Sequence, residues 1–351
     1  MEVGLPGDPQ KVIKMSIRII AEIGVNHNGS VDLAKEMVIH AKESGANMVK
    51  FQTFSADSLA AISTPKVPYQ LRTSDPGESH HAMLKKLELS KEAHIELKAF
   101  CDRLGIEFFS TPYSRVDAEF LNDLGVSTFK VASADIIDRK LHEFIAGTGK
   151  ECLLSVGMAT MEEIAATLEL YEYRNAKKRV ILLTCVSAYP ADPSDVNIRV
   201  METLREQFGC LVGFSDHTRG VECAIAAAAL GACVIEKHFT LDKTMPGPDH
   251  AASSTPEEFA VLVNAVRTVE QALGDGIKRI CRSEEEMRAL SRKSIVAARD
   301  LPVGCALTDR DITFRRPGSG ISPMQYPELL GRTLMVVKKE GEQITWEDVQ
   351  D

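Results

Sequence analysis

The sequence predicts an α/β protein, a (β/α)8 barrel followed by a small β-rich domain, and three observations predict it. From residue 17 onward, eight short apolar runs rich in β-branched residues alternate with longer stretches of helical periodicity. Most of these runs are apolar throughout, as in parallel strands that helices cover on both faces. The alternation stops near residue 282, and the remaining chain is richer in Gly, Pro and β-branched residues, as expected of short strands joined by tight turns.

Eight strand–helix units in series is the number that such a barrel contains. The helical segment VDLAKEMVIHAKESG (31–45) has apolar residues at helical spacing and ends in glycine, and MEEIAATLELYEY (161–173) and GVECAIAAAALGA (220–232) behave likewise. A doubly wound open sheet is the alternative, but the first strand–helix junction, EIGVNHNGS, lacks the GxGxxG pattern typical of that fold. The expected strands are 17–24, 46–54, 106–112, 128–133, 152–158, 180–189, 211–216 and 234–240.

The chain is expected to divide into four parts. Residues 1–16 form a leader that lacks the apolar core of a signal peptide. The barrel covers 17–282, a charged linker covers 283–292, and the β-rich domain covers 293–351. An insertion at 55–90 follows the second strand, and we expect it to shape the mouth of the barrel.

Composition limits the class of protein. The 351 residues are 44% hydrophobic and 26% charged, which is typical of a globular chain with a sizeable core. The net charge of −9 argues against a nucleic-acid binder, but it is compatible with a local basic pocket for an anionic substrate. No apolar run is long enough to span a membrane. The eight cysteines form no CxxC pair, so we expect reduced thiols and a cytoplasmic location.

Polar residues gather at the carboxyl ends of the expected strands, where (β/α)8 barrels carry their catalytic residues. Lys50 and Lys130, with several hydroxyl side chains between them, predict a site for a small polyanion: a carboxylate, a phosphate or both. The alternative for either lysine is a surface side chain whose ammonium group reaches water. The polar residues at these ends are Glu22, Lys50, Gln52, Thr111, Tyr113, Lys130, Ser133, Asp135, Ser155, Ser187, Tyr189, Ser215, His217, Glu236 and His238, with Asp249 in the last loop.

Two histidines, His217 and His238, end consecutive expected strands. Because adjacent strands lie about 4.8 Å apart, both imidazoles can reach one divalent metal ion. The alternative is a pair of ordinary hydrogen-bonded histidines. Since no thiolate pattern lies nearby, a tetrahedral structural zinc site is not favoured, and an open site completed by water and a substrate oxygen fits better. His27 and His250 lie in expected mouth loops, and the other histidines are assigned no chemistry.

A series of motifs at these strand ends resembles the sialic acid synthase family, which includes N-acetylneuraminate synthase and the synthases of legionaminate and pseudaminate. The resemblance extends over almost the whole chain from about residue 17. It implies a (β/α)8 barrel with a C-terminal antifreeze-like (SAF) domain. The motifs that carry it, in order, are AEIGVNHNGS, VKFQTF, FFSTPYS, FKVASAD, LSVGMAT, VSAYPADPSDVN, VGFSDHTRG, VIEKHFTLDKTMPGPDH and FRRPGSGISP.

The resemblance implies an enzyme that condenses phosphoenolpyruvate with N-acetylmannosamine, or a close analogue, to give N-acetylneuraminate and phosphate. It also implies a divalent metal ion, usually Mn²⁺, with Mg²⁺ or Co²⁺ as alternatives. Another acceptor, 2,4-diacetamido-2,4,6-trideoxymannose, would give N,N'-diacetyllegionaminate, and a 6-phosphorylated N-acetylmannosamine is a further option. A non-catalytic carbohydrate-binding or ice-binding protein is disfavoured, because the polar set of the barrel is intact. A class II metal aldolase would have no need for the paired lysines.

The resemblance also assigns roles to individual residues. His217 and His238 match the metal ligands, and Glu22 and Asp249 match acidic residues that hold sugar hydroxyls. The expected catalytic residues are Glu22, Asp135, His217 and His238. The residues that match the phosphoenolpyruvate site are Lys50, Lys130, Ser133, Ser155, Ser187 and Ser215, with Thr111 close by; Gln52, Tyr113 and Tyr189 are expected in the same cavity.

Three positions need separate comment. In many family members residues 132–135 read Gly-Ser-Gly-Glu, whereas this chain has Ala-Ser-Ala-Asp, so Asp135 keeps the acid on a shorter side chain. Ser187 stands where some members have asparagine. Arg316, in RRPGSG, matches an arginine that reaches the barrel of a partner subunit near the N-acetyl group of the sugar, which implies a domain-swapped homodimer.

Overall fold

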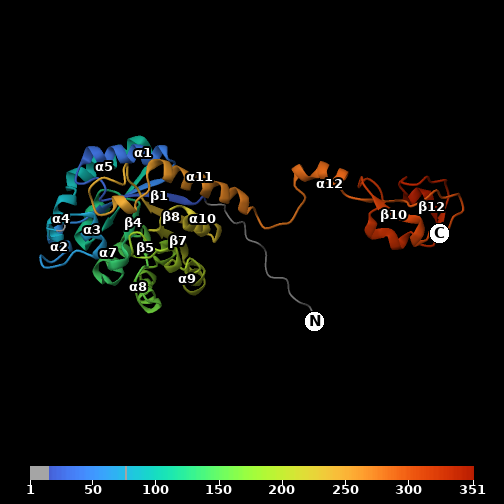
Figure 1. Cartoon of the computed structure of the whole chain (residues 1–351). Coiled ribbons are helices and arrows are strands. Elements are labelled where there is room, and N and C mark those ends of the chain that lie inside the picture. Colours follow the sequence, from blue (N-terminus) through green and yellow to red (C-terminus); the bar gives the residue numbers. More distant parts are fainter. Residues whose placement is uncertain (1–15, 76) are drawn as a thin grey trace. The chain divides into compact units, whose positions relative to one another are not determined.

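The computed structural model describes residues 16–75 and 77–351, so the expected leader, apart from Ser16, lies outside the described residues. Eight parallel strands close into a barrel in the order β1 to β8, which confirms the (β/α)8 fold (Figure 1). The strands are β1 (Arg18–Gly24), β2 (Met48–Thr53), β3 (Glu107–Pro112), β4 (Thr128–Val131), β5 (Glu151–Ser155), β6 (Val180–Thr184), β7 (Leu211–Asp216) and β8 (Val234–His238).

Five strands end earlier than their apolar runs predict: β2 at Thr53 and β8 at His238, where ends at 54 and 240 are expected, and three others. Strand β4 ends at Val131, β5 at Ser155 and β6 at Thr184, whereas the sequence predicts ends at 133, 158 and 189. The chain leaves the sheet because the next residues find other partners. The hydroxyl of Ser133, for example, accepts a hydrogen bond from the Gly157 N–H at 3.1 Å. These early ends create loops that surround the carboxyl end of the barrel.

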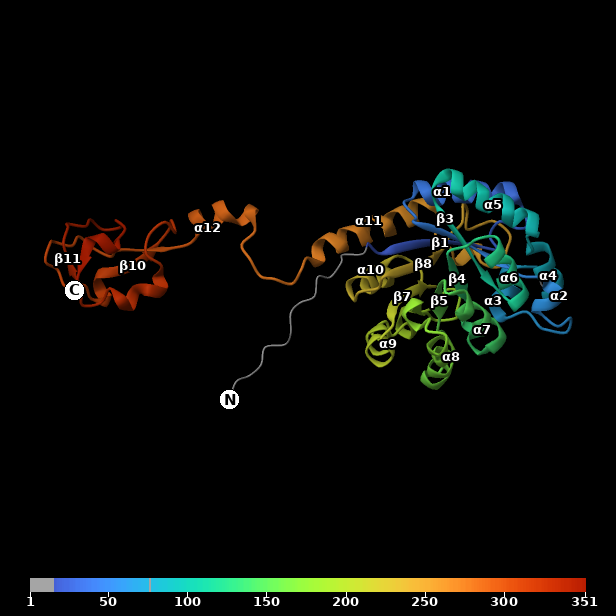
Figure 2. The same ribbon diagram turned by 180° about the vertical axis from the view of Figure 1, so that it is seen from behind.

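Helices surround the barrel in both views (Figures 1 and 2). The three helices expected from periodicity are confirmed as α1, α8 and α10, and side-chain caps at Ser30 and Thr160 fix the starts of the first two. The barrel helices are α1 (Val31–Glu43), α5 (Lys91–Leu104), α6 (Arg115–Asp123), α7 (Arg139–Thr148), α8 (Met161–Tyr173), α9 (Val200–Phe208), α10 (Glu222–Ala229) and α11 (Pro256–Leu273).

The insertion at 55–90 contains three short helices: α2 (Ala56–Leu59), α3 (Pro68–Thr73) and α4 (His80–Leu87). Helix α4 packs its apolar side chains on the barrel, in a cluster with Val25 and Phe54. Helix α3 has no buried residue. The insertion is therefore anchored by α4, while α3 is held by contacts other than apolar burial.

The barrel interior has an apolar level beneath a polar one, because side chains two residues apart on a strand face the same side. In β1, Ile20 belongs to the apolar level and Glu22 lines the cavity above it. The other apolar side chains inside the barrel are Met48, Phe109, Leu153, Ile181, Leu183 and Val234. This level closes the barrel below the site.

The chain divides into two compact units, and the division falls after Gly274. The barrel domain was expected to continue to residue 282, and the expected linker at 283–292 contains helix α12 (Glu285–Ser291). The second unit pairs β9 (Ser294–Ala297) with β10 (Ile312–Arg315), and β11 (Thr333–Leu334) with β12 (Val349–Gln350), both antiparallel. It has its own apolar core, which includes Ile295, Leu307, Leu329, Leu334 and Ile344.

Short 3-10 helices connect several elements: Ser133–Ile137, Lys177–Arg179, Pro193–Asp195, His250–Ala252, Arg282–Glu284, Asp309–Asp311, Pro323–Glu328 and Trp346–Asp348. Two of them, Ser133–Ile137 and His250–Ala252, lie in loops at the carboxyl end of the barrel and bear on the site below. None of the helices in the described ranges combines the length and apolar character that a membrane crossing requires.

Candidate active site

A cavity of about 650 Å³ lies at the carboxyl ends of the strands. Fourteen of the sixteen residues predicted for the site line it, and they come from all eight strand–loop junctions of the barrel. These are Glu22, Lys50, Gln52, Thr111, Tyr113, Lys130, Ser133, Ser155, Ser187, Tyr189, Ser215, His217, His238 and Asp249. The lining does not include the two others, Asp135 and Arg316.

The floor of the cavity is a buried set of paired charges. The Lys50 ammonium lies 2.9 Å from Glu22 Oε1 and donates a hydrogen bond to Thr111 Oγ1 at 3.0 Å. Glu236 Oε1 lies 3.8 Å from Lys50 Nζ and 3.6 Å from Lys130 Nζ. Both lysines are only 4% exposed, which excludes the alternative of surface lysines.

Burial and pairing shift the pKa values of these groups in different directions. Burial raises the pKa of Glu22 and outweighs the effect of Lys50. Burial alone would also raise the pKa of Glu236, but Lys130 and Lys50 outweigh it, so this pKa is lowered. Burial lowers the pKa of Lys130, an effect that Glu236 offsets in part. Because Glu22 takes up a proton more readily than an ordinary carboxyl group, the floor can carry excess positive charge, which suits an anion.

Glu236 was seen at a strand end but given no role by the sequence. It precedes His238 by two residues on β8, so both side chains point into the barrel. The Ser215 hydroxyl donates a hydrogen bond to Glu236 Oε1 at 3.0 Å, while Glu236 Oε2 is buried without a partner. The period of two along VIEKH was the signal that could have identified it.

His217 and His238 are neighbours, as predicted, with ring centroids 5.5 Å apart. The Nδ1 of His217 lies 2.6 Å from the carbonyl oxygen of Val186, to which it donates, so its Nε2 carries a lone pair. The Nδ1 of His238 is buried without a hydrogen-bond partner, and its nearest acidic group is Asp249 at 3.9 Å. Burial lowers the pKa of His217 to about 4 and that of His238 well below its usual value.

This donor set fits an open metal site. Two neutral imidazoles are good ligands for a divalent ion, and the unpartnered Nδ1 of His238 is a buried polar atom that lacks an acceptor role in the protein. In the part of the chain that the structure describes, no group of three or more His, Cys, Asp and Glu side chains could hold a metal ion. A closed structural site is therefore not supported, and remaining coordination positions would fall to water or substrate.

Hydroxyl side chains line the wall next to Lys130. Ser155 Oγ is buried without a partner, so it is free to donate to a ligand. Ser133 Oγ lies 3.1 Å from Cys185 Sγ. A Cβ at Gly157 would come within 2.8 Å of Cys185 Sγ and Ser187 Oγ, so glycine is needed for this wall to approach so closely.

The insertion forms part of the cavity wall, as the sequence predicts for the mouth. Tyr69 of α3 donates a hydrogen bond to Asp249 Oδ1 at 3.4 Å, and its ring lies 5.1 Å from that of Tyr189. Burial raises the pKa of Asp249 to about 6. Glu236 lines the cavity as well, and the residues that line it without being predicted are Val67, Pro68, Tyr69, Arg72, Ala132, Ala134, Met158, Cys185, Ala188 and Pro190. Helix α3 is short and has no apolar pattern from which the position of its cavity-lining residues could be predicted.

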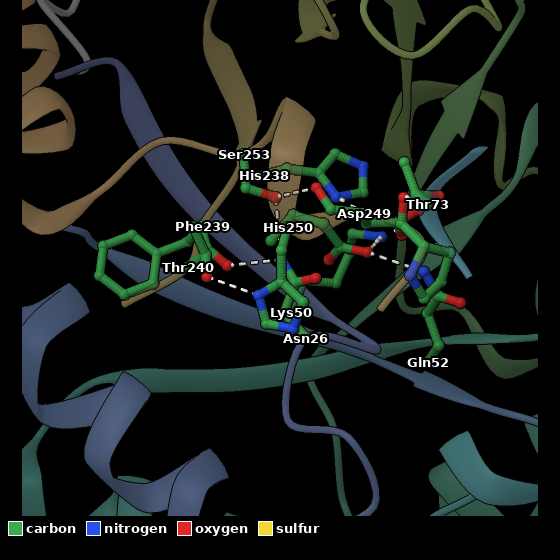
Figure 3. Close-up of polar contacts among 12 residues, drawn as sticks. Asn26, Lys50, Gln52, Thr73, His238, Phe239, Thr240, Asp249, His250 and Ser253 are labelled. Atoms are coloured by element: carbon green, nitrogen blue, oxygen red, sulfur yellow. Dashed lines mark hydrogen bonds and ion pairs between the residues drawn. The ribbon is translucent and has the colours of Figure 1, made fainter. Parts of the chain in front are cut away.

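Gln52 links two predicted residues at the centre of the cavity. Its Nε2 donates to Glu22 Oε1 at 3.2 Å, and its Oε1 accepts from the Tyr113 hydroxyl at 3.2 Å (Gln52 is labelled in Figure 3). The hydrogen bonds Tyr113–Gln52–Glu22 run from the loop after β3 through β2 to β1 and hold the carboxyl group of Glu22 in place. Glu22 Oε2 is left buried and unpaired. This oxygen is available to a substrate.

Asp135 lies outside the cavity lining, and Arg316 belongs to the second unit. Asp135 sits half-buried in the 3-10 helix Ser133–Ile137, its Oδ2 is buried without a partner, and burial together with Asp138 raises its pKa to about 6. The backbone carbonyl of Asp135 is held by His142 Nε2 at 3.2 Å. Arg316 is exposed in the second unit, next to Arg315, which pairs with Glu340 at 2.9 Å.

Comparison with known proteins identifies the family. The NeuB family model matches residues 37–278, and the SAF domain model matches residues 292–350. The chain is 44% identical to the N,N'-diacetyllegionaminic acid synthase of Campylobacter jejuni, over 93% of this chain and 98% of the relative. It is 42% identical to the protein of the same name from Legionella pneumophila, over 96% and 95%.

A solved structure agrees with these relatives. The N-acetylneuraminic acid (sialic acid) synthetase from Leptospira borgpetersenii, in complex with citrate, superposes with a TM-score of 0.68 at 33% identity, over 78% of this chain and 90% of that one. Both domain models, the curated relatives and the cavity of paired lysines and histidines agree with one another. The chain belongs to the NeuB family, the phosphoenolpyruvate-dependent condensing transferases that make sialic acids, and it carries a SAF domain after its barrel.

Proposed function

We propose that the chain condenses phosphoenolpyruvate with 2,4-diacetamido-2,4,6-trideoxymannose, and that the products are N,N'-diacetyllegionaminate and phosphate. The observation that carries the reaction is the pair of buried ammonium groups, Lys50 and Lys130, at the floor of a cavity that two neutral histidines border. The choice of acceptor is supported by the two relatives of that name, at 44% and 42% identity. N-Acetylmannosamine, the first choice from the sequence, is the second candidate, supported by the Leptospira structure at 33%.

The cations and hydroxyl groups of the floor would bind phosphoenolpyruvate. Lys50 and Lys130 neutralise a carboxylate and a phosphate through charge-assisted hydrogen bonds, which are the stronger kind. The unpartnered Ser155 hydroxyl adds a donor without first breaking a contact in the protein. Ser133, Ser187, Ser215 and Thr111 line the same region.

The reaction forms one carbon–carbon bond and one carbon–oxygen bond to water, and it breaks the carbon–oxygen bond to phosphate. Carbon 3 of phosphoenolpyruvate bonds to the aldehyde carbon of the sugar, and the aldehyde oxygen takes up a proton. Water adds to the electron-deficient carbon 2 and loses a proton. The bond from carbon 2 to the phosphate oxygen then breaks, the hydroxyl group that came from water gives its proton to the leaving phosphate, and carbon 2 becomes the keto carbon. Fixed charges that favour these changes lower the barrier without having to reorganise.

The acidic residues divide this work by their surroundings. Glu22, with its raised pKa and its unpaired Oε2, can hydrogen-bond an oxygen of the sugar in either protonation state. Asp249 and Gln52 hold further hydroxyl groups of the acceptor. Asp135, with a pKa of about 6, is the candidate for the proton that the water loses. Because it lies beside rather than in the cavity lining, a bridging water would carry that proton.

A divalent ion, Mn²⁺ in the first place, with Mg²⁺ or Co²⁺ as alternatives, would be held by His217 and His238, and when bound it would supply Lewis acidity to the acceptor's aldehyde. The proposal also includes a domain-swapped homodimer, in which Arg316 completes the acceptor site of the partner subunit. The exposed side chain of Arg316 supports this part.

The test is phosphate release from phosphoenolpyruvate with Mn²⁺, with N-acetylmannosamine, its 6-phosphate and the diacetamido sugar offered in parallel. We expect release with the diacetamido sugar at the highest kcat/KM, loss of activity with a chelator, recovery on adding Mn²⁺, and a nine-carbon keto acid by mass spectrometry. Faster release with N-acetylmannosamine would transfer the assignment to that acceptor. No phosphate release with any of the three sugars would contradict the proposed substrates.

A further inference from the structure

The loop between β8 and α11, residues 239–255, carries Asp249 and is tied to the barrel by polar side chains that are buried or, at Asn28, half-buried (Figure 3). We propose that five of these residues, Asn26, Asn28, Thr240, His250 and Ser253, form a loop clamp that positions the Asp249 carboxylate for the acceptor sugar. This inference rests on the proposed function, in which Asp249 contacts the sugar. The clamp residues do not line the cavity and so act through Asp249.

The clamp begins at the backbone of Asp249 itself. The Ser253 hydroxyl donates to the Asp249 carbonyl oxygen at 2.7 Å and accepts from Asn26 Nδ2 at 2.8 Å. The second hydrogen of the same Asn26 amide goes to the Phe239 carbonyl oxygen at 2.9 Å. Asn26 belongs to the turn after β1, so it joins that turn to both ends of the loop. Both hydroxyl functions of Ser253 are used, and the side chain is 2% exposed.

His250 forms the second tie, and its neighbours fix its tautomer. Thr240 Oγ1 donates to the Asp242 carbonyl oxygen, so it must accept from His250 Nδ1, which lies 2.7 Å away. Nδ1 therefore carries the hydrogen, and Nε2 accepts from Asn28 Nδ2 at 3.2 Å. The other hydrogen of that amide reaches the Pro246 carbonyl oxygen at 2.9 Å. A fully buried neutral histidine with both nitrogens used in this way holds the loop in one arrangement.

Gly247 lets the loop come this close to the turn. Its φ is +148°, and a Cβ there would lie 2.7 Å from His250 Cδ2 and 2.9 Å from Asn28 Oδ1. Asn28 itself has a φ of 50°, in the left-handed region that asparagine tolerates better than most residues. The backbone on both sides of the contact is thus shaped for the hydrogen bonds of the clamp.

Helix α3 holds the same loop from the other side. Thr73 Oγ1 lies 3.0 Å from the Pro248 carbonyl oxygen, one residue before Asp249, and Tyr69 donates to Asp249 Oδ1. Asp249 Oδ2 lies 3.9 Å from His238 Nδ1. The carboxylate is therefore set between helix α3 and a histidine of the site. An error of about 1 Å in such a group is enough to impair a reaction strongly.

Ser253→Ala tests the clamp because it removes one hydroxyl and adds no bulk. Its matched control is Ser254→Ala, since Ser254 is similarly buried and its hydroxyl makes no hydrogen bond in the described part of the chain. We expect Ser253→Ala to raise the KM for the diacetamido sugar about five- to tenfold, with the KM for phosphoenolpyruvate within about twofold, while Ser254→Ala resembles the wild type. Thr73→Val applies the same test to the contact that helix α3 makes with the loop, outside the clamp, and Thr73→Ser should restore the wild-type value.

The same change in an Asp249→Ala background separates positioning from a general structural role. If the clamp acts through Asp249, adding Ser253→Ala to the Asp249→Ala variant should raise the KM for the diacetamido sugar by less than about twofold. An undiminished effect in that background, equal rises in both KM values, or no difference from Ser254→Ala would overturn the proposal. An inactive wild type would instead contradict the proposed function, and an unchanged acceptor KM in Asp249→Ala alone would remove the role of Asp249 on which the clamp depends.

Discussion

On five strands of the barrel, the two levels of the interior lie only two residues apart, yet one level is apolar and the other is polar, with paired charges. Ile20, Met48, Phe109, Leu153 and Val234 form the lower level. Their partners on the same face at the upper level are Glu22, Lys50, Thr111, Ser155 and Glu236. The lower level stabilises the barrel by burying apolar surface, and the upper level keeps charges that the fold itself does not need.

The upper level is tolerated because its charges are matched. Removing ions from water costs several kcal/mol each, and only close pairing and hydrogen bonds offset that cost. Here Lys50 contacts Glu22, and Glu236 lies between both lysines. Stability and chemistry are therefore assigned to different levels of one interior. Substitutions at the two levels should therefore have separable effects on the free energy of unfolding and on the binding of phosphoenolpyruvate.

The largest effect is expected from Glu236→Leu, which extends the apolar level upward. Lys130 would lose its nearest carboxylate while remaining buried, so we expect the free energy of unfolding to fall by about 3–5 kcal/mol. Urea unfolding followed by circular dichroism measures it. Glu143→Leu breaks an exposed pair with Arg139 and is the control, with an expected loss of less than about 1 kcal/mol. Similar losses in the two variants would mean that the charges of the upper level are not coupled as described.

Leu153→Ala removes apolar side-chain volume from the lower level, and it should lower stability without weakening the binding of phosphoenolpyruvate. The side chain is fully buried in the barrel, so we expect a loss of about 3 kcal/mol in the free energy of unfolding, from lost burial and the cavity left behind. The KM for phosphoenolpyruvate should stay within about twofold of the wild type. Leu211→Ala, at a half-exposed strand start, should change neither quantity appreciably. A large rise in KM for Leu153→Ala would show that the two levels are not independent.

A smaller effect is expected at Asp135, from the pH dependence of kcat/KM for phosphoenolpyruvate. A pKa raised from 3.8 to about 6 means that the carboxyl group is neutral below about pH 6. If the carboxylate accepts a proton, activity should fall as the pH drops through 6, rather than near 4. Asp135→Asn should remove this acidic limb and lower the plateau on the order of a hundredfold.

Asp138→Asn is the matched variant for that profile. Asp138 helps to raise the pKa of Asp135, and it caps helix α7 by accepting from the Leu141 N–H, a role that asparagine can also fill. The acidic limb should move to lower pH while the plateau is unchanged. A limb that stays in place in both Asp135→Asn and Asp138→Asn would assign the titration to another group.

The fold and most of the site could be predicted because apolar runs mark the strands and polar residues mark their ends. The pairing of Glu22 with Lys50 could not be predicted, since it depends on the register that places these residues opposite each other on β1 and β2. Tyr69 was missed because α3 is short and buries no side chain. The loop clamp depends on residues far apart in the chain, such as Asn26 and Ser253, which only the folded structure brings together.

The most direct test of the central claim, that the upper level binds phosphoenolpyruvate, is calorimetric titration of this ligand into the wild type, Lys50→Met and Leu153→Ala. If the upper level binds phosphoenolpyruvate, the wild type should bind it, and Leu153→Ala should bind it with an affinity within about threefold of the wild type. Lys50→Met should lose at least about a hundredfold in affinity, since a buried charge-assisted contact is removed. Wild-type affinity in a folded Lys50→Met variant would contradict the account.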